Sequence, residues 1–496
     1  MVNDGGETTG KSAVRLGCAG GASQHSFQFV LFIQHIVTRK GGAMKRWHAV
    51  LLCCSFLAFL PACEKDSTGP DDVELAQSQE TALDLMEATA WEQDASMAKI
   101  KYKGKALPFF KREVLTGDIV HYSFRVHVGA GAYDFIGIHR VVKERKVGQP
   151  IKTAKNLFLQ HGDSKDFTGM FLNGVRTPNV ADDFGIAIFL ARNDVDVWGI
   201  DQNWALVPAS VTDFTFMKDW GIENQADNLK LAMEIAQFAR KYSGCGSNAL
   251  NLSGYSSGVL TGYALLNKEA KLAKNKRVVA GWIPVDCPYK SNDATAREVF
   301  AAAYTTYKAM VDAANYVEVQ LFPLSGQAVR DNPDGASAIF EGFTNFQTAM
   351  FLSAGQVFSP LAFHYFAGVL EGDAFTDFQY VTRDECWDFL IDSVPYEADH
   401  FEMDYTAIIS DAVPVPWDDN LNLITVPVFN VAAAGGMGDL TPYTTTLLGS
   451  TDVQNLVVRL HPAGEEALDF GHIDLFMAHN AEALVWTPIL NWVKAH

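Results

Sequence analysis

The chain has 496 residues, of which 48% are hydrophobic, 12% aromatic and 20% charged, and its formal net charge is −19. A chain this rich in apolar and aromatic residues is not mainly disordered, and its acidity argues against a nucleic-acid-binding surface. It contains no internal repeat and no run of 18 charge-free apolar residues that would span a membrane.

Residues 44–63 have the features of an export signal. Two basic residues precede an apolar run over 49–62, which has the length of a signal-peptide core and is too short to span a bilayer. The run ends in the letters LPAC and resembles the lipobox of bacterial lipoproteins. This resemblance implies cleavage before Cys63, lipidation of Cys63 and an exported, membrane-anchored protein. Glu64, in place of an aspartate, favours the outer membrane if the host is Gram-negative. A secretory signal with an incidental cysteine is the alternative.

The signal divides the N-terminal part of the chain. Because it opens at Met44, we expect translation to begin there and residues 1–43 to be a mis-annotated leader; a genuine long leader is the alternative. Residues 44–62 then form the signal peptide and 63–90 a polar tether. Three cysteines remain beyond this region: Cys245, Cys287 and Cys386. They can form one disulfide at most, and the sequence does not show which pair would form it.

Strand and helix patterns alternate from residue 118 onward. Segments 118–128 and 133–142 are rich in β-branched and aromatic residues and predict an antiparallel pair. Short apolar strands and segments of helical periodicity then follow one another, which favours a mostly parallel sheet with helices on both faces. The predicted strands are 156–160, 194–200, 249–252, 278–285, 427–433 and 456–460, and the predicted helices are 224–242, 259–272 and 482–493.

The alternation is interrupted between residues 289 and 420. This stretch predicts aromatic-rich helices at 296–314, 336–354 and 356–370. We therefore expect one α/β core, formed by 91–288 and 421–496, with a helical cap insertion at 289–420. Its aromatic side chains either form the core of the cap or line an apolar ligand pocket.

Gly254-Tyr255-Ser256-Ser257-Gly258 fits the pattern G-x-S-x-G between a predicted strand and a predicted helix. In this context the serine stands on a strained strand-to-helix turn, and the helix N-terminus offers backbone N–H groups to a developing oxyanion. The motif predicts Ser256 as a nucleophile. A plain Gly/Ser turn is the alternative.

A serine nucleophile needs a base, and His472 lies in Gly471-His472-Ile473-Asp474 after the last predicted strand. The G-x-S-x-G turn, the late Gly-His-x-Asp and the order serine, acid, histidine resemble the α/β-hydrolase superfamily over about residues 118–496, the insertion excepted. Residues 196–201 (DVWGID) also resemble a strand of lipases related to the acid lipases.

The resemblance implies an acidic partner for the histidine. Asp439, at the end of the glycine-rich stretch AGGMGD after the penultimate strand, is the first choice. Asp286, at the end of the strand before the insertion, is the alternative because some members of the superfamily take their acid there.

The resemblance also implies an oxyanion hole with two backbone N–H donors. One is the N–H of Ser257, which follows the nucleophile. The other is the N–H of Asp163, since His161-Gly162 after strand 156–160 resembles the His-Gly of lipases and esterases. The family often has an apolar residue after this pair. We therefore expect the Asp163 side chain to be hydrogen-bonded or to point away from the hole.

Together these residues predict a hydrolase that cleaves a small or lipid-like carboxylic ester through an acyl-enzyme. Thioester or amide hydrolysis would use the same residues, and a non-catalytic, lipid-anchored binding protein is the alternative from another class. No metal-ligand spacing is present, so neither a metal nor another cofactor is predicted. Besides the substrate, the membrane is the one expected partner.

Overall fold

The computed structural model describes residues 101–102, 105–106, 111–246 and 248–496. The predicted leader, signal peptide, Cys63 and tether lie outside the described residues. Within the described ranges, no helix combines the length and the hydropathy that a membrane span requires.

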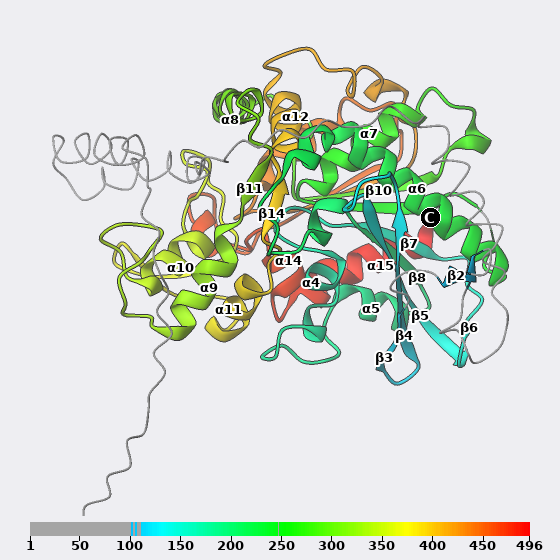
Figure 1. Ribbon diagram of the computed structural model, residues 1–496, viewed down its shortest axis with the longest axis horizontal. Helices are drawn as coiled ribbons and strands as arrows, with labels where there is room; N and C mark the ends of the chain where they lie inside the picture. The colour runs from blue at the N-terminus through cyan, green and yellow to red at the C-terminus, as the bar shows by residue number, and fades with distance from the viewer. Residues whose placement is uncertain (1–100, 103–104, 107–110, 247) are drawn as a thin grey trace, which may run out of the picture. The chain divides into compact units, whose positions relative to one another are not determined.

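A twisted sheet of ten strands forms the centre of the fold (Figure 1). The strand order is β16-β15-β10-β9-β7-β8-β5-β4-β3, with β6 paired to β5. Strands β7 to β10, β15 and β16 are parallel, whereas β3, β4 and β5 form an antiparallel edge next to β8. The strands are β3 (Lys111–Thr116), β4 (Ile119–His127), β5 (Phe135–Lys146), β6 (Gln149–Pro150), β7 (Asn156–Gln160), β8 (Asp196–Asp201), β9 (Leu250–Tyr255), β10 (Val279–Val285), β15 (Val428–Ala433) and β16 (Val453–Val458). A separate short pair joins β1 (Lys101–Tyr102) to β2 (Lys105–Ala106).

Helices cover both faces of the sheet (Figure 1). Neighbouring residues of β10 point to opposite faces, so their contacts separate the two layers. Trp282 packs edge-on against Tyr263 of α7, while the position of Gly281 faces Trp492 of α15. One layer contains α6 (Ile222–Tyr242) and α7 (Gly258–Glu269). The other contains α4 (Phe167–Phe171), α5 (Ile186–Arg192), α14 (Asp474–Met477) and α15 (Thr487–Ala495).

The predicted strands and core helices agree with these elements. Strand 156–160 coincides with β7, and the pair 118–128 and 133–142 is the antiparallel pair β4 and β5. Helix 224–242 is α6, which begins two residues earlier, at Ile222. These elements were predictable because the buried strands are short apolar runs and helix α6 carries apolar side chains at helical spacing.

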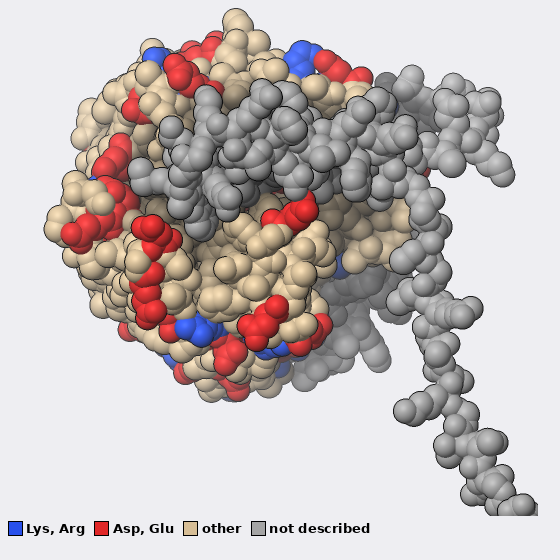
Figure 2. Space-filling model, turned by 90° about the vertical axis from the view of Figure 1, so that its left-hand side faces the viewer, with Lys and Arg blue, Asp and Glu red and all other residues tan. Residues whose placement is uncertain are grey.

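Residues 289–420, here called the inserted segment, run between the neighbouring parallel strands β10 and β15. Helices α9, α10 and α11 of this segment lie on the side of the molecule that Figure 2 shows. On this side, acidic side chains cover more of the surface than basic ones. The segment contains α8 (Ala294–Asp312), β11 (Val317–Val319), α9 (Leu321–Asp331), α10 (Asn345–Ala354), β12 (Gly368–Glu371), β13 (Ala374–Phe378), α11 (Arg383–Ile391), β14 (Tyr396–Ala398) and α12 (Asp399–Ser410).

The helix predictions in the inserted segment are only partly confirmed. Helix α8 matches 296–314, but the second helix begins at Asn345 because Thr344 caps it together with Gln347. The helix predicted at 356–370 is wrong, since this stretch is a loop that leads into β12. It contains Pro360, which removes a backbone donor and disfavours helical geometry in the residue before it.

The three cysteines of the described region are free thiols. Cys245 and Cys386 are buried, and Cys287 is partly exposed. No disulfide therefore connects the described elements, and packing and hydrogen bonds hold them together.

A buried ion-pair network ties three elements of the core together. Asp196, at the start of β8, is fully buried and accepts a hydrogen bond from Arg140 Nε of β5 at 2.8 Å. Arg240 of α6 binds the other carboxylate oxygen. Both guanidinium groups are themselves buried, so this carboxylate is a shared counter-charge for two cations that water cannot reach.

We expect Asp196→Ala to lower the free energy of unfolding by about 3–5 kcal/mol, because it leaves two buried cations without their counter-charge. Thermal unfolding followed by circular dichroism measures this loss. The matched control is Asp183→Ala, which removes an exposed partner of Arg192 and should cost about 0–1 kcal/mol. Equal losses in the two variants would contradict the assignment.

Candidate active site

Ser256 occupies the tight turn between β9 and α7. Its backbone φ is +55°, in the left-handed region that side-chain-bearing residues rarely adopt. Its N–H donates to the carbonyl of Val285 at 2.9 Å, so the turn is held against the end of β10. This is the strained strand-to-helix turn that the sequence motif predicts for a nucleophilic serine.

His472 is paired with Asp286, the residue that follows β10. The imidazole Nδ1 lies 2.7 Å from the carboxylate Oδ2, and both side chains are buried. A carboxylate at Nδ1 keeps the proton on that nitrogen and leaves Nε2 with a lone pair. The ring also stacks on Tyr255, the residue before Ser256, with centroids 4.7 Å apart. The serine and histidine loops are therefore neighbours.

The acid that meets the histidine is not the first choice from the sequence. Asp439 is exposed and pairs with Arg459, whose Nη2 lies 2.7 Å from its Oδ1. Asp286, the alternative, stands beside His472 instead. The strands before both aspartates end at the same edge of the sheet, so the sequence could not show which carboxylate would reach the imidazole.

The glycine-rich loop after β15 binds Asp286 rather than supplying the acid. Asp286 Oδ1 accepts hydrogen bonds from the N–H groups of Ala433 at 2.9 Å and Met437 at 3.2 Å. A Cβ atom on Gly436 would lie 2.0 Å from Asp286 Oδ2, so only glycine allows the loop to close around this carboxylate. The loop thus satisfies a carboxylate that has no contact with water.

The loop predicted to carry an oxyanion donor lies against the nucleophile. A Cβ atom on Gly162 would lie 2.5 Å from Ser256 Cβ, which shows how closely the two backbones approach. His161 is buried and holds this loop, because its Nε2 accepts the N–H of Gln202 at 3.0 Å. The Asp163 carboxylate accepts a hydrogen bond from Ser257 Oγ, which confirms that its side chain is hydrogen-bonded.

The inserted segment contacts the histidine loop directly. The N–H of His472 donates to the carbonyl of His364 at 2.9 Å, and the N–H of Ile473 donates to that of Tyr365 at 2.7 Å. The ring of Phe363 lies 5.1 Å from the imidazole, measured between centroids. The segment therefore forms a wall of the site.

Two residues of the inserted segment near the site carry no signal in the sequence. Glu397 of β14 and Glu402 of α12 lie beside Asp163, with one carboxylate oxygen of each residue within 4.8 Å of the others. Burial raises the pKa of Asp163 to about 7 and raises the pKa of both glutamates well above the ordinary value. More than 230 positions separate Asp163 from either glutamate, so no spacing rule could have grouped them.

Comparison with known proteins identifies the fold. No protein-family model and no curated protein matches the chain. A provisionally assigned lipase from Sulfolobus solfataricus is 16% identical, covers 78% of this chain and 99% of its own, and has a TM-score of 0.53. A monoglyceride lipase variant from Saccharomyces cerevisiae is 13% identical over 79% of this chain and 96% of its own, with a TM-score of 0.37. The first match, together with the sheet order, shows the α/β-hydrolase fold that the sequence resembles.

We expect Asp286→Asn to slow phosphonylation of Ser256 by a fluorophosphonate probe by roughly 10⁴-fold, because the amide no longer favours the required tautomer or stabilises an imidazolium. Asp439→Asn removes only the exposed pair with Arg459 and should label at the wild-type rate. The labelling rates of the two purified variants measure this difference. If Asp439→Asn were labelled more slowly than Asp286→Asn, the result would identify Asp439 as the acid.

Asp474 links the histidine loop to the inserted segment and should make stability depend on pH. Its Oδ2 accepts the N–H groups of Ala367 and Gly471, both at 2.8 Å, and burial raises its pKa to about 7. Because this pKa is higher in the folded state than in the unfolded chain, the stability it contributes is complete below about pH 4 and is lost as the pH rises towards 7.

Asp474→Asn retains an acceptor oxygen but cannot ionise. We expect the difference in melting temperature, variant minus wild type, to increase as the pH rises from about 4 to 8. Melting curves of both proteins across this range measure the effect. Parallel curves would show that Asp474 does not titrate in the folded state.

Proposed function

We propose that this protein is a serine hydrolase that cleaves carboxylic esters. The observation that supports the proposal is the position of Ser256, on a left-handed turn, next to Tyr255, whose ring stacks on the imidazole of the buried pair His472 and Asp286. The fold, shared with a provisionally assigned lipase, agrees with this function but does not establish it.

In the proposed reaction, Ser256 Oγ attacks the ester carbonyl carbon while His472 Nε2 takes the hydroxyl proton. The N–H groups of Ser257 and Asp163 bind the oxyanion of the tetrahedral intermediate. His472 then returns the proton to the leaving alcohol, which leaves an acyl group on the serine. A water molecule, activated by the same imidazole, releases the acid. Throughout, the Asp286 carboxylate orients the ring and stabilises its cationic form.

The inserted segment favours a small or lipid-like ester over a polymer. Its residues Phe363 and Tyr365 contact the catalytic histidine, so a substrate would reach the serine beside an aromatic wall. Thioester and amide hydrolysis require the same nucleophile and base, and the choice among these reactions rests on the leaving group.

We also propose that residues 289–420 form a cap domain on an α/β core, and that Cys63 carries the lipid that anchors the exported enzyme to the cell envelope. The cap follows from the insertion of this segment between two paired strands. The anchor rests on the signal-like sequence that ends at Cys63.

We expect the protein to hydrolyse p-nitrophenyl esters and Ser256→Ala to reduce kcat by at least about 10⁴-fold, because the acyl-enzyme can no longer form. A series from acetate to palmitate, measured by release of nitrophenolate, also defines the preferred acyl length. The control is Ser210→Ala, which removes an exposed hydroxyl outside the site and should leave kcat unchanged.

A non-catalytic binding protein would give a different result. Such a protein would show neither turnover of these esters nor fluorophosphonate labelling of folded wild-type chain. Labelling without ester turnover would show that the serine is nucleophilic and that the substrate is a thioester or an amide instead of an ester.

A further inference from the structure

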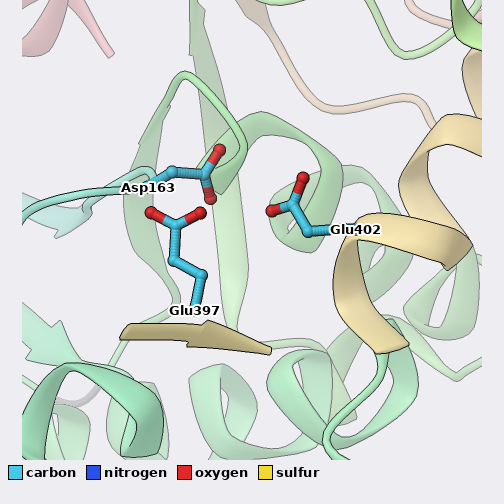
Figure 3. A group of neighbouring side chains, drawn as sticks. All are labelled: Asp163, Glu397 and Glu402. Carbon is cyan, nitrogen blue, oxygen red and sulfur yellow. The ribbon is translucent and has the colours of Figure 1, made fainter. Parts of the chain in front are cut away.

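Three carboxylates from distant parts of the chain converge beside the candidate oxyanion loop (Figure 3). Asp163 comes from the core, and Glu397 and Glu402 come from the inserted segment. Figure 3 shows the three side chains pointing toward one another, and one oxygen of each lies within 4.8 Å of the other two. Glu397 and Glu402 are only 4% and 3% exposed, so solvent does little to screen the repulsion between their carboxylates.

One carboxylate in this group has an oxygen without a partner. Glu402 Oε1 is buried and accepts no hydrogen bond from the described residues. An oxygen in this state costs free energy unless a proton or a cation occupies the space in front of it. The Glu402 side chain points toward the other two carboxylates in Figure 3, so one occupant could contact all three residues.

The surroundings supply no positive charge to this group. In the described parts of the chain, no lysine, arginine or histidine forms an ion pair with Asp163, Glu397 or Glu402. The charged groups that act on them most strongly are carboxylates, including Glu318, which faces Glu397 across the pair β11 and β14. A cation from solution would therefore neutralise a concentrated negative charge.

We propose that Asp163, Glu397 and Glu402 bind a divalent cation and that their all-oxygen ligand set favours Ca²⁺. Calcium binds oxygen ligands at about 2.3–2.6 Å, so two ligand oxygens on opposite sides of the ion lie up to roughly 5 Å apart. The carboxylate oxygens, which lie within 4.8 Å of one another, are close enough to bind one such ion. Magnesium requires near-octahedral ligands at about 2.0–2.1 Å and loses its water reluctantly, so a site made of three protein carboxylates suits it less.

The bound ion would join the inserted segment to the oxyanion loop. Asp163 accepts a hydrogen bond from Ser257 Oγ, and Glu397 accepts the N–H of Ser164. Ser257 is itself a proposed oxyanion donor, and Ser164 follows the other proposed donor, Asp163. Calcium at this point would thus hold the loop in position without touching the substrate.

Calcium binding can be measured on the full chain without any substrate, so the result does not depend on the proposed hydrolysis. The protein is first treated with a chelator and then titrated with CaCl₂ by isothermal titration calorimetry. We expect saturable one-site binding with a Kd between about 10⁻⁷ and 10⁻³ M, the range of protein calcium sites. The melting temperature should rise with added Ca²⁺, and Mg²⁺ should bind more weakly.

Variants connect the binding to these carboxylates. Glu402→Gln should weaken Ca²⁺ binding at least tenfold, while the matched control Glu298→Gln, an exposed residue of α8, should retain the wild-type affinity. Ser256→Ala should also bind Ca²⁺ normally, which separates this site from the nucleophile. If Glu402→Gln does not fold, the wild-type titration still decides.

Two results would overturn the proposal. The first is the absence of saturable Ca²⁺ binding and of a shift in melting temperature in the wild-type chain, which would mean that shared protons stabilise the three carboxylates. The second is unchanged Ca²⁺ affinity in a folded Glu402→Gln variant.

Discussion

The hydrogen bond between Asp286 and His472 is the interaction on which the proposed site depends. It joins the end of β10, before the inserted segment, to a loop that follows β16. A carboxylate with no contact with water must be matched by donors, and here the imidazole and the N–H groups of Ala433 and Met437 supply them. The neighbouring positions of β10 and β15 in the sheet make this arrangement possible, because both strands end at the same edge.

The inserted segment is part of the same arrangement. Its backbone carbonyls accept the N–H groups of His472 and Ile473, and Asp474 binds it in return through the N–H of Ala367. On the other side of the site, its buried glutamates face Asp163. The segment therefore contacts both the loop of the base and the loop of the proposed oxyanion donor. A change in its position would move both loops relative to the serine.

The sequence predicted features that depend on neighbouring residues. Strands β7 and β10 follow from short apolar runs and helix α6 from apolar side chains at helical spacing, while Ser256 follows from a five-residue motif in its local context. Prediction was weaker in the inserted segment. Helices α9, α11 and α12 were not predicted; each has twelve residues or fewer, and so few turns give a weak signal in the sequence. The stretch 356–370 was apolar enough to suggest a helix, yet it forms the loop that packs on the histidine.

The sequence by itself indicated the class of fold, through alternating strand and helix patterns, and the candidate serine and histidine, through motifs of a few neighbouring residues. Tertiary structure decided between Asp286 and Asp439, since that choice depends on which of two neighbouring loops turns its carboxylate inward. It also brought Asp163 to Glu397 and Glu402 across more than 230 positions. Local periodicity records which side of a strand or helix is buried. It does not record which buried side chains meet, because the packing of the whole chain sets those contacts.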